Sequence, residues 1–253
     1  MSAIIIKSPR EIELMRRACR VVAEALDFAG GLIKPGVTTE ALDKAIGAFI
    51  LGKDCGVAFK GLYGFPANSC ISINEQVVHG IPGPRKLAAG DIVSIDVGAR
   101  HKNYHGDAAR TYPVGEVSEE DGKLMRVCEE SLERGISVIR AGCPLSDLSA
   151  EIQKYVESNG FSVVRKYVGH GIGSDFHEEP QIPNFVEPGR GRGIILQAGM
   201  VLAIEPMVNA GGHDVKKLDD GWTVVTVDGR KSAHFEHTVL VTADGAEVLT
   251  RPA

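Results

Sequence analysis

A pattern of apolar residues and glycine occurs twice along the chain. Leu14-Met15-Arg16 recurs as Leu124-Met125-Arg126, and five further positions recur at a constant separation of 106 residues. These positions are Ile33, Gly36, Leu42, Ile46 and Ile50, matched by Ile139, Gly142, Leu148, Ile152 and Val156. Amphipathic helices can resemble one another by chance, but an internal duplication fits best. Because no linker separates the halves, we expect one domain over residues 1–253, with pseudo-repeats at about 8–115 and 118–248.

Each half is expected to begin with two helices and to continue with strands. Ser8, with Glu11 three residues later, has the form of a capping box, and apolar residues recur at helical spacing after it. A second helix is expected after Pro35-Gly36, and Ser118 and Ser146 are expected to open the corresponding pair in the second half. Segments with a period of two follow each pair. This order predicts an α+β fold with both helix pairs on one face of a shared antiparallel sheet.

Composition excludes several classes of function. Acidic residues outnumber basic ones by 33 to 28, which argues against a nucleic-acid partner held by phosphate contacts and against a polybasic membrane patch. No charge-free apolar stretch reaches bilayer-spanning length, and the first apolar run is too short for a signal peptide. The five cysteines, which form no C-x-x-C pair, are expected to be reduced and buried. We therefore expect a cytoplasmic protein that does not bind a membrane. We also expect it to be a monomer.

Two aspartates on consecutive strands could meet across a hairpin. Asp96 ends one predicted strand and Asp107 lies on the next. If His101-Lys102 forms the tip of a two-residue turn, the two carboxylates stand directly opposite each other at roughly 5 Å. Two ionised carboxylates at that distance repel, and a bound cation or a shared proton would relieve the repulsion. The alternative is a longer or shifted turn that exposes one aspartate to water.

Three further residues of the second half have the chemistry of metal ligands. His170 lies between Gly169 and Gly171, where a backbone can approach closely, and Glu205 and Glu236 adjoin apolar strands in which an ionised carboxylate needs a partner. A lone histidine is commonly structural, and either glutamate could meet solvent or an arginine. Taken together, two Asp, two Glu and one His favour two divalent ions such as Mn, Co, Fe or Zn over a thiolate zinc site.

Two other histidines and a group of apolar residues fall in loops or turns. His79 and His177 could hydrogen-bond the carbonyl oxygen or amide nitrogen of a substrate, or could be ordinary surface residues. Core packing explains any one of the apolar residues, whereas as a group they could line a pocket for an apolar side chain. The group consists of Phe59, Leu62, Phe65, Cys70, Phe176 and Trp222.

In order and spacing, seven motifs between about Ser8 and Val248 resemble those of the type I methionine aminopeptidases. The motifs are CISINE from Cys70, VHGIP from Val78, IDVG from Ile95, HGD from His105, GHGIG from Gly169, IEPM from Ile204 and FEHT from Phe235. The resemblance implies the pita-bread fold of that family, with its two pseudo-symmetric halves. It also implies an enzyme that removes the initiator methionine from nascent polypeptides when the second residue is small.

The same resemblance implies a role for each polar candidate. Two divalent metal ions would be held by a set of five ligands, of which Asp107 and Glu236 would bridge the ions. Glu205 would also handle the proton of a bridging water, His79 would contact the N-terminal side of the substrate or the scissile nitrogen, and His177 would steady the carbonyl oxygen of the tetrahedral intermediate. The implied ligands are Asp96, Asp107, His170, Glu205 and Glu236.

The pocket departs from the family pattern, and two other functions stay open. Family members often carry Tyr at the positions of Leu62 and Phe65, and Cys or a small residue at that of Phe59, so we expect a more apolar pocket. Another pita-bread peptidase, such as an X-Pro aminopeptidase, would use the same ligands, although such enzymes carry an extra N-terminal domain. A non-catalytic binding module would have lost the metals, and the presence of all five ligand positions opposes it. Transient association with the ribosome is implied only by the origin of the substrate.

Overall fold

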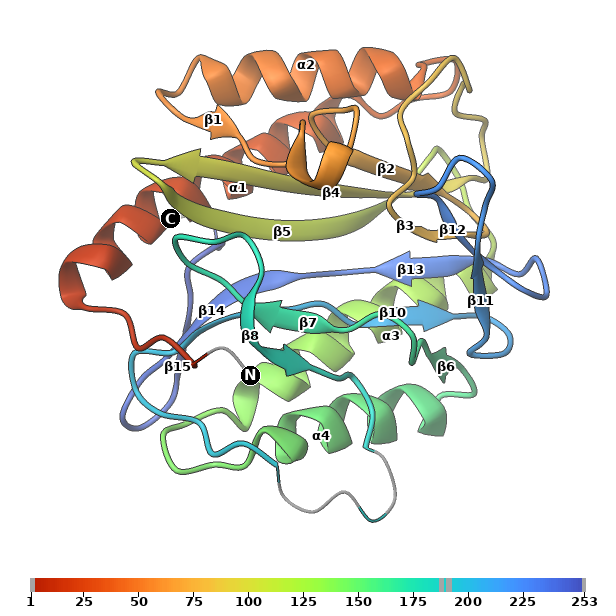
Figure 1. The fold of residues 1–253 in the computed structure, drawn as a ribbon. Helices are drawn as coiled ribbons and strands as arrows, with labels where there is room; N and C mark the ends of the chain where they lie inside the picture. Colours follow the sequence, from red (N-terminus) through yellow and green to blue (C-terminus); the bar gives the residue numbers. More distant parts are fainter. Residues whose placement is uncertain (1–2, 187–188, 190–192, 252–253) are drawn as a thin grey trace.

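A computed structural model describes residues 3–186, 189 and 193–251, and in this part of the chain helices and strands follow one another twice (Figure 1). The helices are α1 (Pro9–Leu32), α2 (Thr39–Leu51), α3 (Glu119–Ser137) and α4 (Leu145–Ser158), with a 3₁₀ turn η1 (Leu62–Gly64). The strands of the first half are β1 (Gly56–Val57), β2 (Cys70–Ile73), β3 (Gln76–Val78), β4 (Ile92–His101) and β5 (Tyr104–Pro113). Those of the second half are β6 (Ser162–Val163), β7 (Gly169–Gly171), β8 (Glu178–Ile182), β9 (Val201–Ile204), β10 (Met207–Asn209), β11 (Val215–Lys217), β12 (Val224–Thr226), β13 (Ser232–His234), β14 (His237–Val241) and β15 (Ala246–Val248).

Capping residues set where the helices begin. The capping box of α1 is confirmed, because Ser8 accepts from the backbone N–H of Glu11 while the Glu11 carboxylate accepts from the N–H of Ser8 at 2.7 Å. Ser118 caps α3 as predicted. The prediction for α4 was wrong by two residues: Pro144 is the N-cap, and Ser146 lies inside the first turn. The backbone of Pro144 is extended and pairs with Ile195, which fixes the point at which the helix can start.

All strand pairs between described residues are antiparallel, as predicted, but they form four sheets rather than one continuous sheet. In the first half, β1 and β2 lie along one edge of β4 and β5 lies along the other. The remaining sheets have the strand orders β13-β10-β6, β11-β12-β3 and β15-β14-β9-β7-β8. Strand β3 of the first half pairs with β12 of the second, so the two halves share a sheet.

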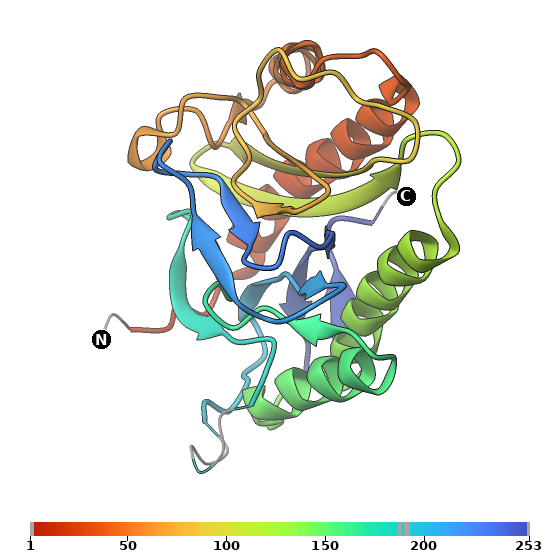
Figure 2. The same cartoon turned by 90° about the vertical axis from the view of Figure 1, so that its right-hand side faces the viewer.

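Each helix pair covers the strands of its own half. Helix α1 packs on β4 and β5, and α3 packs on β10 and β13. Figure 2 shows the strands between α2 at the top and α4 at the bottom. Two large apolar clusters fill these layers. Leu26, Ile46 and Ile95 belong to the first cluster, and Leu132 and Ile152 to the second.

Corresponding backbone contacts recur in the two halves at the positions that the sequence repeat aligns. Gly36 and Gly142 both have positive φ, 90° and 88°. The N–H of Gly36 donates to the carbonyl of Leu87, and the N–H of Gly142 donates to that of Leu196, both at 2.8 Å. Left-handed backbone of this kind favours glycine, so the repeat of glycine in the sequence reflects a repeated turn.

The β4–β5 hairpin turns one residue later than predicted. His101 pairs with Tyr104, so Lys102-Asn103 forms the tip, with φ values of 46° and 69°. A two-residue turn of this type needs positive φ at both central residues, which asparagine tolerates better than most residues. Asp96 consequently faces Ala109 and not Asp107, and the predicted pairing of the two aspartates was wrong. Since the partner changes by two residues, both carboxylates still lie on the same face as diagonal neighbours.

Two further expectations can be compared with the described residues. All five cysteines are buried and free, as predicted. No helix in the described ranges has the length and apolar character needed to cross a membrane.

Candidate metal centre

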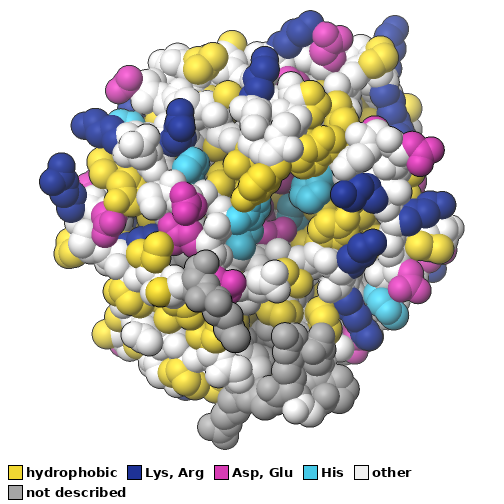
Figure 3. Space-filling model, in the orientation of Figure 1, with side chains coloured by type: hydrophobic (Ala, Val, Ile, Leu, Met, Phe, Trp, Pro, Cys, Tyr) yellow, Lys and Arg dark blue, Asp and Glu magenta, His cyan; other side chains and the backbone are white. Residues whose placement is uncertain are grey.

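Every side chain proposed from the sequence as a ligand, a catalytic group or a pocket residue lines one pocket, with a volume of about 150 Å³. At the centre of the face seen in Figure 3, histidine and acidic side chains gather in a hollow beside hydrophobic ones. The pocket joins the two halves. Its residues are Phe59, Leu62, Tyr63, Phe65, Cys70, His79, Asp96, Asp107, His170, Phe176, His177, Glu205, Trp222 and Glu236.

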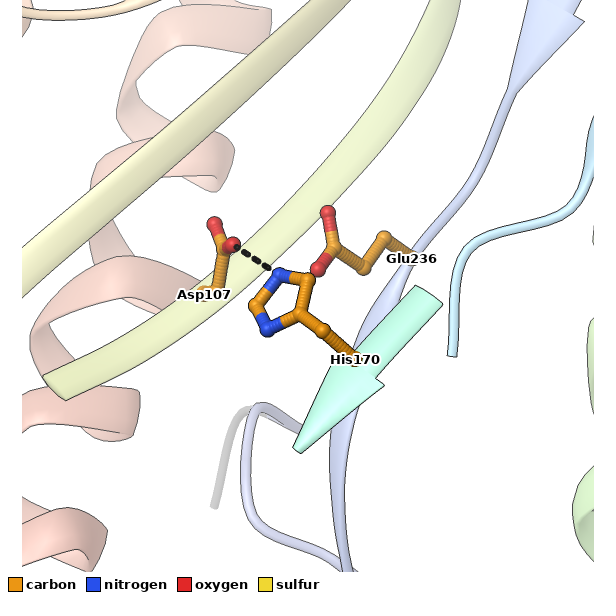
Figure 4. Close-up of side chains that lie close together, drawn as sticks. All are labelled: Asp107, His170 and Glu236. Atoms are coloured by element: carbon orange, nitrogen blue, oxygen red, sulfur yellow. Dashed lines mark ion pairs between the residues drawn. The ribbon is translucent and has the colours of Figure 1, made fainter. Parts of the chain in front are cut away.

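Three of the proposed ligands converge from different elements (Figure 4). Asp107 comes from β5, His170 from β7 and Glu236 from the link between β13 and β14. One ligand atom from each lies within 4.8 Å of the others, and all three residues are buried. Nε2 of His170 lies 3.8 Å from Oδ2 of Asp107 and 3.7 Å from Oε1 of Glu205, which adds a fourth proposed ligand to the group.

The backbone around His170 fixes which of its nitrogens faces the carboxylates. Nδ1 lies 2.8 Å from the carbonyl oxygen of Gly171, and because a carbonyl only accepts, Nδ1 carries the proton. The lone pair on Nε2 is then directed at the acidic group, as a metal-binding imidazole requires. A Cβ at Gly169 or Gly171 would lie 2.3 Å from a carbonyl oxygen of a neighbouring strand. The two flanking glycines therefore allow the close approach that the sequence predicted.

The carboxyl groups of this cluster are costly to ionise without a cation. Burial first, and neighbouring acidic groups second, raise the pKa values of Asp96, Asp107, Glu205 and Glu236 well above their usual range. Among the described residues, Oδ1 of Asp96, Oδ1 of Asp107 and Oε1 of Glu236 are buried without a hydrogen-bond partner. Buried oxygens with raised pKa values and free lone pairs fit divalent cations, which accept lone pairs and offset negative charge.

Two histidines stand at the rim of this cluster. His79 follows β3 with a φ of 59°, and burial lowers its pKa to about 4, with His177 contributing, so the ring is neutral at neutral pH. Its ring lies edge-on to Trp222, with the centroids 6.5 Å apart. His177 is exposed, and its centroid is 4.3 Å from that of His170. The left-handed backbone conformation of His79 costs about 1–3 kcal/mol, and such strain is commonly found at functional sites.

An apolar slot adjoins the polar cluster. The rings of Phe59 and Phe176 meet edge to face at 5.3 Å, and those of Phe65 and Trp222 at 5.1 Å. A Cβ at Gly98 would lie 2.8 Å from both Phe59 and Phe176, so only glycine leaves room for this aromatic packing. Burial, and next the charge of Asp96, raises the pKa of Cys70, which lines the slot as a neutral thiol.

Two residues of the site were not foreseen. Tyr63 lies at the mouth, where its ring stacks on that of His177 at 5.7 Å, and it has a positive φ of 49°. His234 is buried, and its Nε2 lies 4.0 Å from a carboxylate oxygen of Glu205 and 4.0 Å from one of Glu236. The period of two could have identified His234, because residues 234 and 236 flank the end of a strand. No comparable signal marks Tyr63, which lies in the 3₁₀ turn η1 with a backbone conformation that is not helical.

Comparison with known proteins shows that the chain is similar to members of one peptidase family. Residues 13–243 match the model of metallopeptidase family M24. The chain is 55% identical to a methionine aminopeptidase of Clostridium perfringens, covering 98% of both chains. It is 54% identical to methionine aminopeptidase 1 of Bacillus subtilis, covering 98% of this chain and 99% of that one. The crystal structure of a methionine aminopeptidase from Thermotoga maritima has a TM-score of 0.95 and 49% identity, covering 98% of this chain and 100% of that chain.

More distant structures share only the fold. A prolidase from Pyrococcus furiosus has a TM-score of 0.80 at 23% identity, and this chain covers 66% of it. The high TM-score with the Thermotoga structure confirms the predicted antiparallel α+β pita-bread fold.

Proposed function

Since the chain belongs to metallopeptidase family M24, we propose that it is a methionine aminopeptidase that removes the N-terminal methionine of nascent polypeptides whose second residue is small. One observation carries the proposal: a buried group of acidic residues and His170 adjoins an apolar slot within one pocket of about 150 Å³. A pocket this small suits a single side chain, which is what an enzyme that removes one terminal residue must recognise.

We propose that five residues hold two divalent ions, with Mn, Co, Fe and Zn all compatible with carboxylate and imidazole ligands. By the resemblance to the methionine aminopeptidases, Asp107 and Glu236 would each contact both ions, and with His170 they offer ligand atoms within 4.8 Å of one another. Bound divalent ions lower the pKa of a water molecule and polarise a carbonyl group. The full set of ligands is Asp96, Asp107, His170, Glu205 and Glu236.

The remaining polar groups would act on the substrate. Glu205, whose pKa is raised by burial and by Asp107, is suited to take the proton of the attacking water and to release it to the leaving amine. His79, neutral and at the edge of the slot, would contact the substrate's N-terminal side or its scissile nitrogen. His177, exposed at the mouth, would donate to the carbonyl oxygen as negative charge develops there.

The apolar slot would take the methionine side chain. Four aromatic rings and Cys70 surround it, and an unbranched thioether side chain adapts well to such a surface. Leu62 extends the wall without adding a polar group. Recognition would therefore depend mainly on burial of apolar area. The aromatic residues of the slot are Phe59, Phe65, Phe176 and Trp222.

We also propose the setting in which the enzyme works. Newly made chains carry their initiator methionine in the cytoplasm, so the protein would act there and would associate only transiently with ribosomes. A monomer suffices, because one chain supplies every proposed ligand and every residue of the slot.

The proposal is tested by peptide cleavage with chelated protein to which a single metal is restored. Met-Ala-Ser should be cleaved, N-acetyl-Met-Ala-Ser should resist because its amine is blocked, and Ala-Pro-Ser should distinguish an X-Pro aminopeptidase. Preferential cleavage of Ala-Pro-Ser would replace the proposal with that activity. A protein that binds no metal and cleaves neither peptide would be a binding module.

A further inference from the structure

His234 faces the proposed metal centre but has no part in the function proposed above. It ends β13, is 2% exposed, and its Nε2 has no hydrogen-bond partner among the described residues. The nearest charged atoms are Oε2 of Glu205 and Oε2 of Glu236, each 4.0 Å from that nitrogen. A buried donor or acceptor of this kind is costly unless something binds it.

The backbone hydrogen bonds of His234 match those of Asp107, so the two residues occupy corresponding positions in the two halves of the chain. The hydroxyl of Thr238 accepts from the N–H of Asp107 at 3.0 Å and donates to its carbonyl at 2.7 Å. The hydroxyl of Thr111 makes the same two bonds to His234, at 2.9 and 2.8 Å. Positions 107 and 111 of one strand thus correspond to 234 and 238 of the other.

An exchange of backbone hydrogen bonds lies midway between the two threonines. The N–H of Glu236 donates to the carbonyl of Ala109 at 2.9 Å, and the N–H of Ala109 donates back at 3.4 Å. This exchange marks a local two-fold axis between the strands. Asp107 and His234 therefore enter the same site from symmetric positions on opposite sides of the axis.

The two oxygens of Glu205 face different partners. Oε1 lies 3.7 Å from Nε2 of His170, and Oε2 lies toward Nε2 of His234. A carboxylate that gives one oxygen to a cation needs a donor for the other, and residues that supply such a donor orient the ligand. A shift of about 1 Å would bring Nε2 of His234 to hydrogen-bonding distance.

We propose that His234 is a positioning residue whose Nε2–H donates to the outer oxygen of Glu205 and so orients that carboxylate toward the metal ions. The inference rests on the proposed metal-dependent function. It assigns His234 to the support of Glu205 and not to the ligand set, because the Glu205 oxygen that lies toward His234 is not the oxygen that lies beside His170.

Three substitutions separate the donor from the bulk of the ring. His234→Gln keeps an N–H close to the position of Nε2, His234→Asn moves the amide toward the position of Nδ1, and His234→Leu removes the donor while keeping an apolar side chain. Chelated protein of each variant is titrated with Co²⁺ or Mn²⁺ by calorimetry. Visible absorption of the Co²⁺-loaded protein reports the ligand set, and the melting temperature of the chelated protein reports the fold.

We expect His234→Leu and His234→Asn to bind the metal about 10- to 100-fold more weakly, the range found when a supporting residue of a metal ligand is lost. His234→Gln should stay within about threefold of the wild type and keep its Co²⁺ absorption bands, since the donor remains. If His234→Leu does not fold, comparing the metal affinities of His234→Asn and His234→Gln provides the same test.

Two outcomes would overturn the inference. Wild-type affinity in the Asn variant would show that the donor is not used, and an altered Co²⁺ spectrum in the Gln variant would make His234 a direct ligand. Wild-type protein is assayed in parallel on Met-Ala-Ser. Failure of the wild type to cleave this peptide would refute the proposed function, whereas normal cleavage with unaffected Asn and Leu variants would refute only the role of His234.

Discussion

The ring of Tyr63 lies nearly parallel to that of His177, with the planes at 25° and the centroids 5.7 Å apart. Tyr63 is 73% exposed, so it stands where solvent and an arriving peptide both reach it. A stacked neighbour restricts the orientations open to an exposed imidazole, and such aromatic pairs contribute about 0.5–1.5 kcal/mol. The stack therefore orients His177 before the substrate arrives.

Tyr63→Ala should lower kcat by about 2- to 10-fold, the rate equivalent of losing that pair, while metal affinity stays unchanged. Tyr63→Phe keeps the ring and should retain wild-type kcat. Steady-state kinetics on Met-Ala-Ser, with metal titration of each variant, checks both statements. If Tyr63→Phe lowers kcat as much as Tyr63→Ala does, the hydroxyl group of Tyr63 and not the stacking of its ring supports the rate.

His177→Ala should reduce kcat by about 100-fold or more, the usual effect of removing a donor to a developing oxyanion. Metal affinity should change little, because His177 is proposed to contact the substrate. Kinetics are compared with the number and affinity of bound ions. Loss of metal in proportion to loss of activity would reassign His177 to the ligand set.

Asp107→Asn should abolish turnover and leave the fold intact. Loss of a residue that only supports a ligand costs about 10- to 100-fold, so loss of a bridging ligand should exceed that range. The chelated variant should melt no lower than the wild type, because burial and the charge of Glu236 oppose ionisation of Asp107. Asp244→Asn, an exposed aspartate, is the control. Near-wild-type activity at saturating metal would contradict the assignment.

Chelated protein should lose stability as the pH rises. Burial and nearby charge raise the pKa values of Asp96, Glu205 and Glu236, so the folded chain binds protons that the unfolded chain releases above about pH 4. The free energy of unfolding then falls from about pH 4 toward the folded-state pKa values. Bound metal replaces these protons and should remove the slope.

Melting temperatures of chelated and metal-loaded protein, measured side by side across this pH range, test the prediction. Carboxyl groups away from the site contribute equally to both forms and cancel in the difference. A gap between the two forms that stays constant or narrows as the pH rises would contradict it.

Norleucine should replace methionine in the substrate with little loss. The slot contains Leu62 and Phe65, so it has few polar groups to satisfy, and one methylene in such a slot is worth only about 1–3 kcal/mol. Comparing kcat/KM for Met-Ala-Ser, norleucine-Ala-Ser and Leu-Ala-Ser decides the point. A large penalty for norleucine would indicate a specific contact to sulfur, with the Cys70 thiol the candidate.

Short-range sequence signals predicted where helices and strands lie better than they predicted which strands pair with one another. The capping box at Ser8 and the helix cap at Ser118 involve residues three apart, and both are confirmed. The hairpin tip was misplaced because both His101-Lys102 and Lys102-Asn103 offer two turn residues, and only the backbone decides between them. The pairing of β3 with β12 joins segments far apart in the sequence and has no local signal. That the chain is one duplicated domain stays a prediction.

The candidate site was predicted more fully than the sheet order. The five proposed ligands and His79 each lie in a short motif, so these residues could be gathered without knowing how the strands pair. The roles of these residues stay predictions. Tyr63 and His234 were missed because stacking and a shared carboxylate depend on how separate loops and strands meet.

Across the local axis between Ala109 and Glu236, facing positions can carry different residues, which two identical subunits could not provide. Two identical half-length chains meeting on such an axis would have to present the same residue from both sides, and a glutamate would then confront its own copy. In a single chain the facing positions can differ: Ala109 adds no second charge beside Glu236, and the carboxyl group of Asp107 is mirrored by the imidazole of His234. A nearly symmetric backbone can thus present an asymmetric surface to a peptide, whose two ends are chemically different.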